Sequence, residues 1–355
     1  MRSRSVRWGE ILIFIGVLVL ALQYIDWKAF APIERADLVI TGGIVLLICF
    51  VLALWSRSLL FDELIHLVAL VVGALALGLI LGSSGITASV GFPSPFSVSK
   101  TVSFEESFTD APTLSITLDI QNGEITVRTW ERENFQITLT ARARSWDFDE
   151  SQRLIESAIQ ALQLSPTGIS FRAPRQSLGP FSSLETDVQL WLPRGRVYEL
   201  RISSLNGAIN VQEINAAVAD LNIMNGRIKL NALTAQNAKL QTANGSISGQ
   251  LSASQATIST ANGSIDFILG RVTGRYELST FNGSIELDVP DDPSVGYAIS
   301  AQSATDRVRV QIPNFVFQRQ ERRYVEGMTS NFESALTTIT IRASTGNGRI
   351  EISPR

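Results

Sequence analysis

The sequence predicts an all-β fold: a β-solenoid of about 19-residue coils with Asn-Gly corners, one inserted amphipathic helix, and three transmembrane helices before it. Two observations predict the solenoid. An Asn-Gly pair recurs seven times, and each pair is followed by one residue and then by isoleucine. A third observation, three long apolar stretches within the first 85 residues, predicts the membrane helices.

Residues 1–85 form the predicted membrane segment, with transmembrane helices at about 11–25, 38–55 and 64–81. Three arginines precede the first stretch, so the positive-inside rule places the N-terminus in the cytoplasm. Three crossings then place the rest of the chain outside the membrane. An alternative interpretation, in which residues 1–31 are a signal peptide, leads to the same exterior placement. We therefore expect a multi-pass protein of the cell membrane, with the lipid bilayer as a partner.

The chain after the membrane segment divides into a linker and an exterior domain. Residues 86–104 are rich in Ser, Gly and Pro and are predicted to be the linker, so the extracytoplasmic domain covers 105–355. Alternating strands surround the first Asn-Gly pair, and an amphipathic helix is predicted at roughly 149–163. We expect its apolar stripe to cover the end or flank of the solenoid, with membrane binding as the alternative.

The Asn-Gly pairs recur in one phase along the exterior domain. Five of them follow one another at spacings of 19, 19, 18 and 20 residues. One pair alone would predict a tight β-hairpin turn, whereas seven in the same phase indicate a repeat architecture. The predicted corner residues are Asn122, Gly123, Asn206, Gly207, Asn225, Gly226, Asn244, Gly245, Asn262, Gly263, Asn282, Gly283, Asn347 and Gly348.

Each predicted coil stacks its isoleucine on that of the next coil, because an isolated coil cannot bury its own apolar face. Gly permits the backbone conformation of the corner. Asn tolerates the left-handed region, and stacked Asn side chains can hydrogen-bond as a ladder. A hairpin meander or a sandwich is the alternative arrangement. The Asn-Gly pair is therefore predicted to be structural, and the small polar residues around it form the surface to test for binding.

The order of elements resembles a known family. A first Asn-Gly coil, an acidic amphipathic helix, an "LPRG" turn, successive "NGxI" coils and the strand end "ELDVP" follow one another over about residues 110–353. This order is similar to that of the "putative adhesin" domains of unknown function found in bacteria and archaea. The resemblance implies a β-solenoid-like domain, often tethered to a membrane, and it supplies no catalytic residues. Residues 291–340 depart from the regular coil pattern, and their role is open.

Composition excludes several classes of site. Cys49 and His66 are the only cysteine and histidine, and both precede the exterior domain, so that domain has no disulfide, Cys-based metal site or His-dependent catalysis. The net charge of -3 argues against nucleic-acid binding. We expect no cofactor and no metal.

Two groups of charged residues are candidate sites. Asp266 and Glu286 occupy equivalent positions in neighbouring coils and could form a carboxylate pair, as in β-helix enzymes that cut polysaccharides. The full set of candidate carboxylates is Asp266, Glu286, Asp288, Asp291 and Asp292. A basic cluster near two phenylalanines could contact anionic lipid or wall polymer, with a solvated loop as the alternative; it comprises Arg319, Arg322 and Arg323, near Phe315 and Phe317.

The sequence therefore predicts a non-catalytic, membrane-anchored protein of the cell envelope, whose exterior solenoid binds or scaffolds. An envelope polymer or another membrane protein is the expected kind of partner. The first alternative is an envelope stress sensor or regulatory subunit that acts through its transmembrane helices. The second alternative is a polysaccharide-active β-helix enzyme.

Overall fold

The structure is a computed structural model that describes residues 96–109, 111–174 and 182–355. The three predicted transmembrane helices and the signal-peptide alternative lie outside these residues. Within the described ranges, no helix is long and apolar enough to cross a membrane. The described chain is built almost entirely of strands and contains one helix, α4 (Phe148–Gln160).

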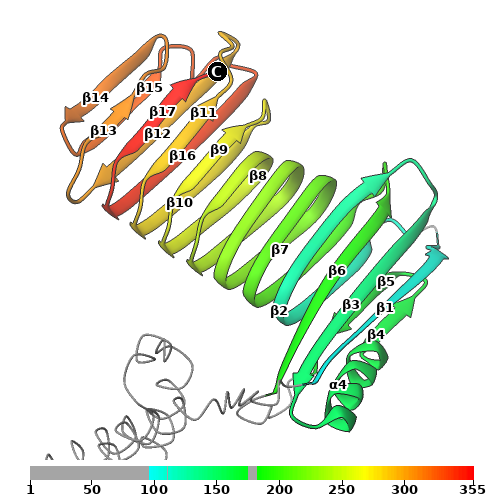
Figure 1. Cartoon of the computed structure of the whole chain (residues 1–355). Helices are drawn as coiled ribbons and strands as arrows, with labels where there is room; N and C mark the ends of the chain where they lie inside the picture. The colour runs from blue at the N-terminus through cyan, green and yellow to red at the C-terminus, as the bar shows by residue number, and fades with distance from the viewer. Residues whose placement is uncertain (1–95, 110, 175–181) are drawn as a thin grey trace, which may run out of the picture. The chain divides into compact units, whose positions relative to one another are not determined.

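Parallel strands stack as coils along the middle of the domain (Figure 1). In stacking order, the strands before each corner belong to β2 (Leu114–Trp130), β7 (Tyr198–Asn244), β8 (Ile247–Asn262), β10 (Gly274–Asn282) and β16 (Thr337–Asn347). β7 is 47 residues long because the strand continues through the bends of successive coils. The strands after the later corners are β9 (Ile265–Leu269), β11 (Ile285–Val289) and β17 (Ile350–Pro354), which also pair in parallel. The coil prediction is therefore confirmed.

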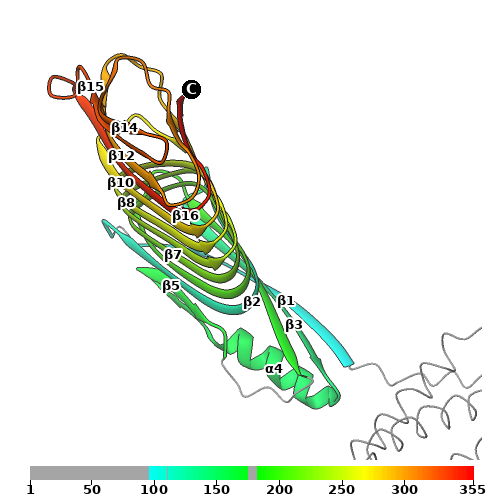
Figure 2. The same ribbon diagram turned by 90° about the vertical axis from the view of Figure 1, so that its left-hand side faces the viewer.

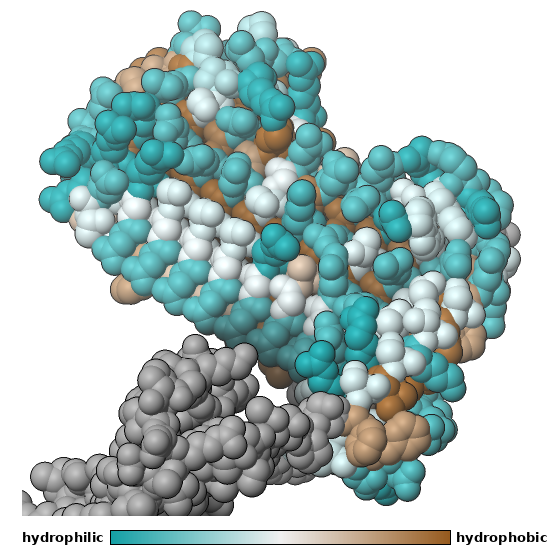
Figure 3. All heavy atoms as spheres, in the orientation of Figure 1, coloured by the Kyte–Doolittle hydropathy of each residue, from teal (hydrophilic) through white to brown (hydrophobic). Residues whose placement is uncertain are grey.

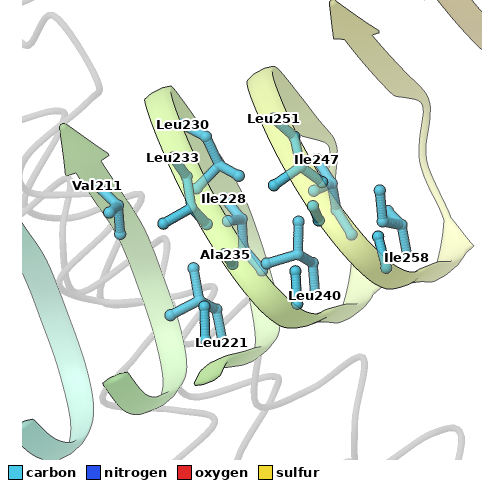
Figure 4. Packing of buried hydrophobic residues seen from close by; sticks show 14 of the residues in the cluster. Val211, Leu221, Ile228, Leu230, Leu233, Ala235, Leu240, Ile247, Leu251 and Ile258 are labelled. Atoms are coloured by element: carbon cyan, nitrogen blue, oxygen red, sulfur yellow. The ribbon is translucent and has the colours of Figure 1, made fainter. Parts of the chain in front are cut away.

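The isoleucine that follows each Asn-Gly pair lies in the core. Ile125, Ile209, Ile228, Ile247, Ile265, Ile285 and Ile350 are each exposed by 1% or less. Figure 4 shows how side chains of one coil point at those of the next, as for Leu221, Leu240 and Ile258. Full burial of such a side chain stabilises the fold by about 1.5–3 kcal/mol before entropy is counted. Repeating this contact in every coil makes the core continuous.

Antiparallel strands close the N-terminal end of the stack (Figure 2). β5 (Gly168–Arg172) and β6 (Ser183–Pro193) pair in parallel with β2, on the side away from β7. β3 (Asn134–Ser145) pairs with β6, β1 (Phe96–Ser107) pairs with β3, and β4 (Leu162–Ser165) pairs with β5, all antiparallel. Antiparallel pairing here ends the repeat.

The helix covers the flank of this end, as expected. Asp147 caps α4 by accepting a hydrogen bond from the Asp149 amide at 2.9 Å. Leu154, Ile155 and Ala158 pack with Ala141, Ala143 and Leu184 in a small core of their own. The predicted helix ran to residue 163, but Leu162 already begins β4, because the chain turns back to pair with β5.

The predicted linker is too long at its C-terminal end. Residues 96–104 belong to β1, which pairs with β3 over twelve consecutive residues. The Ser-rich composition misled the prediction because β1 is largely exposed and needs few apolar residues. Only Val98 and Val102 of this strand pack against the two cores.

Most of residues 291–340 forms the C-terminal cap, and residues 337–340 already begin the final coil, which answers the question that the sequence left open. β12 (Val295–Ser303) pairs in parallel with β16, and β13 (Val308–Val310) pairs with β17. β15 (Tyr324–Thr329) then pairs antiparallel with β12, and β14 (Phe315–Glu321) pairs with β15. The final coil of the chain, β16–β17, thus lies between the β10–β11 coil and this cap.

Candidate binding surface

The seven corner asparagines form one hydrogen-bonded column. Each amide donates to the side-chain oxygen of the asparagine in the preceding coil at 2.7–2.9 Å, in the order Asn206 to Asn122, Asn225 to Asn206, Asn244 to Asn225, Asn262 to Asn244, Asn282 to Asn262 and Asn347 to Asn282. Asn122, in the first coil, donates to the carbonyl of Leu184 on β6 at 3.3 Å. All the amides therefore point along one direction of the stack.

The corner glycines form a second column, in which each glycine stands over a carbonyl. A Cβ built on Gly245 would lie 1.7 Å from the oxygen of Gly226, and one on Gly207 would lie 1.8 Å from the oxygen of Gly123. Gly245 also has a φ of +151°, which side-chain-bearing residues rarely adopt. No side chain fits between stacked corners at this position.

The corner asparagines do not use the left-handed backbone that asparagine tolerates. In the described part of the chain, the non-glycine residues with positive φ are Glu213, Ala232 and Asn314, and none of them belongs to a corner. Asparagine serves the corner through its side-chain amide, which donates to one neighbour and accepts from the other.

A third column, which sequence reasoning missed, supports the corner from inside. Thr242, Thr260, Thr280 and Thr345 stand two residues before the asparagine, are buried, and donate to the glycine carbonyl of the coil below at 2.9–3.3 Å. These threonines fall in the inward phase of the strand. A polar residue repeated in that phase was the signal that could have revealed the column.

The arm before each corner presents small polar residues outward. One row, which we name the serine row, comprises Gln241, Ser259, Ser279 and Ser344, which are in register across four coils. Stacked strands place its members about 4.8 Å apart. Figure 3 shows rows of hydrophilic and near-neutral residues crossing the coils on the face in view. Such a row offers hydroxyl and amide groups at a fixed spacing.

The next outward row carries charge. Lys239, Thr257, Glu277 and Arg342 are in register two residues before the serine row. Exposed residues of opposite sign at this spacing attract one another modestly and keep the surface soluble. The outward face of the arm therefore combines a neutral row with a row of mixed charge.

The structure brings three of the five candidate carboxylates together. Asp266 and Glu286 are directly paired in register, and Asp288 lies two residues further along the strand. Burial first, then the negative charges of Glu286 and Asp288, raise the pKa of Asp266. The Glu286 carboxylate accepts a hydrogen bond from Arg349. Glu286 is therefore engaged in an ion pair with an arginine of the last coil.

Of the other two candidates, Asp292 holds a turn through its carboxylate, whereas Asp291 is bonded through its backbone. The Asp291 amide donates to the carbonyl of Arg355 at 3.1 Å. Asp292 accepts hydrogen bonds from the Ser294 amide and hydroxyl, which lower the pKa of Asp292, and it pairs with Arg271 at 3.0 Å. Within the described ranges, no group of three acidic, histidine or cysteine side chains could hold a metal ion.

A stack of two tryptophans and two arginines lies at the N-terminal end, and sequence reasoning missed it. The Arg128 guanidinium lies 3.4 Å from the ring centroid of Trp191, which stacks on Trp130 at 5.5 Å, and Arg132 lies over Trp130 at 4.7 Å. Register between β2 and β6 pairs Arg128 with Trp191. Because the rings cover one another, the stack stabilises the packing of β6 against β2 of the first coil.

The basic cluster of the C-terminal cap is partly satisfied within the chain. Arg319 pairs with Glu321 at 2.7 Å and lies 4.8 Å from the ring centroid of Tyr324. Arg323 donates to the carbonyl of Ala304 at 2.8 Å. Phe315 and Phe317 contact each other edge to face at 5.0 Å. Two of the three arginines thus hold the cap together.

Comparison with known proteins shows one family and several distant structures. The family model described as Toastrack DUF4097 matches residues 113–267 and again residues 196–352. No curated protein matches the chain.

Three solved structures are similar to the chain. A "putative cell adhesion protein" from Clostridium sporogenes is 12% identical, covers 74% of this chain and 100% of its own, and gives a TM-score of 0.34. A "putative adhesin" from Parabacteroides distasonis and another from Bacteroides fragilis are each 12% identical. Each covers 71% of this chain and 97% of its own, with TM-scores of 0.34 and 0.33.

Proposed function

Because this chain belongs to the Toastrack DUF4097 family, we propose that it is a membrane-anchored protein of the cell envelope whose exterior β-solenoid binds or scaffolds without catalysis. The observation that carries this proposal is the fixed spacing of the outward side chains of the serine row. Ladders of asparagine and threonine fix each coil against the next, so the outward hydroxyl and amide groups keep their spacing. A surface fixed in this way loses little entropy when it binds an extended partner.

A non-catalytic role is supported by how the acidic residues are used. Glu286 is engaged by Arg349, and Asp292 holds a turn with Ser294 and Arg271. A hydrolase of the β-helix kind needs one carboxyl group as an acid and a second as a free base or nucleophile. We expect no hydrolysis of envelope glycans by the full chain, measured as release of reducing ends.

Membrane anchoring is supported by the three apolar stretches in residues 1–85 and by the arginines before them. A reporter fused after Arg355 is expected to be active only outside the cytoplasm. Activity of that fusion in the cytoplasm alone would contradict the exterior placement.

Binding is tested with the full chain in lipid nanodiscs, mixed with isolated envelope fragments and sedimented. The test variant carries Ser259→Glu, Ser279→Glu and Ser344→Glu, all on the serine row. The matched control carries the same change after the corner, at Ser246, Ser264 and Ser284. We expect the first triple to weaken binding at least about tenfold and the control to stay within about twofold. If the wild-type chain does not sediment with the fragments, the proposal fails.

A sensor or regulatory role is the second candidate. It is favoured by the number of apolar stretches, since one helix suffices to anchor a domain. In that case residues 1–85 alone would co-purify with a second membrane protein, and the serine-row variant would leave this association unchanged.

A further inference from the structure

We propose that the free edge of β1 is a dimerisation surface, on which β1 of a second copy pairs antiparallel about Ser103. This inference is independent of what the serine row binds. It rests on three features of the strand: an open edge, an incompletely covered apolar side, and a sequence that is complementary to itself.

The outer edge of β1 is open over its whole length. All twelve residues of Phe96–Ser107 pair with β3 in unbroken register, and no other described strand pairs with β1. The strand therefore presents a row of backbone N–H and C=O groups without strand partners. Proteins normally protect such edges with bulges, prolines or charges, because an open edge is a template for another strand.

The edge strand at the opposite end of the solenoid, β14, carries features that protect a strand edge against pairing. β14 also pairs with one strand only. Its register shifts between Phe317 and Arg319, and it carries the charged side chains of Arg319 and Glu321. β1 has neither a register shift nor a proline; Lys100 is its one charged residue between Phe96 and Phe104, and Glu105 and Glu106 follow near its end. The contrast indicates that the edge of β1 is left open.

The even-numbered side chains of β1 extend the buried side of β3. Val102 and Phe104 lie beside Leu139 and Ile137, which are fully buried. Val102 packs against the main core, yet the Phe104 side chain next to it is 37% exposed. A neighbouring strand would cover this phenylalanine.

The sequence of β1 is complementary to itself around Ser103. In an antiparallel pair centred there, Lys100 faces the partner's Glu106, and Val102 faces the partner's Phe104. The two-fold axis repeats both contacts. Within the described residues, neither Lys100 nor Glu106 has an ion-pair partner. Opposite charges and apolar pairs directly across two strands each stabilise the pairing.

No neighbouring register matches as well. Centring the pair on Val102 places Lys100 opposite Phe104 and Glu106 opposite Val98. Centring it on Phe104 places Val102 opposite Glu106. Only the register about Ser103 joins opposite charges and apolar side chains on the same side of the sheet.

Helix α4 leaves the proposed surface clear. The Phe148 ring contacts Phe96 edge to face at 6.0 Å, and Val98 packs against the helix core. Both contacts lie in the first part of β1, away from Ser103. Because the strands run in opposite directions, the two helices would stand at opposite ends of the shared sheet.

The first test uses disulfide formation in the full chain, in membranes, with Cys49→Ser to remove the natural thiol. Ser103→Cys is expected to form a covalent dimer on mild oxidation, since the two thiols would meet at the axis. Ser97→Cys is the matched control: it lies on the same side and edge, but its two copies would be roughly 40 Å apart. Equal crosslinking of both variants, or of neither, overturns the proposal.

The second test exchanges the charges and measures the mass of the detergent-solubilised full chain as a function of concentration. Lys100→Glu and Glu106→Lys are each expected to raise the dimer dissociation constant about tenfold, because each places like charges opposite one another. The double exchange is expected to restore the wild-type value. A dimer that is insensitive to all three variants lies elsewhere, and a wild-type chain that stays monomeric excludes the dimer.

Discussion

Asn244 shows why asparagine recurs at every corner of the stack. Its amide donates to Asn225 and its oxygen accepts from Asn262, so removing the side chain breaks two bonds. The side chain of Asn347, at the top of the column, makes only the bond to Asn282 within the described residues.

We predict that Asn244→Ala lowers the free energy of unfolding by about 1–2 kcal/mol and that Asn347→Ala lowers it by about half as much. The difference follows from the number of side-chain bonds lost, since both residues are exposed. Denaturant unfolding of the full chain in detergent measures it. Equal effects of the two changes would show that the column does not act as a ladder.

Glycine is required at the corner for a reason that its φ alone does not give. We predict that Gly245→Ala lowers the free energy of unfolding by about 3 kcal/mol or more, because its Cβ would meet the Gly226 carbonyl. Gly195 is the matched control: its φ is +85°, but no atom lies within 4 Å of an added Cβ. Gly195→Ala should cost only about 1–2 kcal/mol. If both variants lose the same stability, backbone strain rather than stacking explains the corner glycines.

At the scale of elements, strands were predictable where one side is buried and the other is exposed to solvent. The alternation around each Asn-Gly pair revealed the coils, and three- and four-residue spacing revealed the helix. β1 was not predictable, because its exposed, Ser-rich sequence has the composition of a linker and its residues pair with β3 residues that lie 27 to 49 positions further along the chain.

The helix and its small core form a unit separate from the solenoid core. We predict that Leu154→Ala lowers the free energy of unfolding of this unit by about 2–4 kcal/mol. Faster amide exchange is expected in β1 and in residues 141–145, while the coils after residue 206 keep their protection. Glu156→Ala on the exposed side of the same helix should change nothing measurable. Loss of protection throughout the coils would show that the two cores unfold together.

At the scale of the whole molecule, order in space departs from order in the chain. The last coil, β16–β17, is inserted between β10–β11 and the cap of β12–β15. The Asn-Gly repeat signalled this, since Asn347 continues the column begun by Asn282 although 65 residues separate them. The cap itself has no repeat and could not be placed from sequence. The family resemblance stated from the "NGxI" pattern is confirmed by the family match.

We predict that removing residues 337–355, which form the last coil, also unfolds the cap that pairs with this coil. β12 pairs in parallel with β16, so without it residues 295–310 should lose their hydrogen-exchange protection, while residues 206–262 keep theirs. Hydrogen exchange on the chain that lacks only residues 337–355 measures both regions. Retained protection in 295–310 would mean that the cap packs on the β10–β11 coil directly.

The sequence by itself determined the coil: its length, its corner, its buried isoleucine and its outward polar rows. These follow from local periodicity, which a single strand and turn already express. The tertiary structure alone decided that the inward threonines support each corner, which strands close the two ends, and that the cap stacks on the last coil. Those features depend on contacts between segments that are apart in the chain, such as Thr242 with Gly226 and β12 with β16. No local pattern encodes such a contact, because it exists only once the coils have stacked.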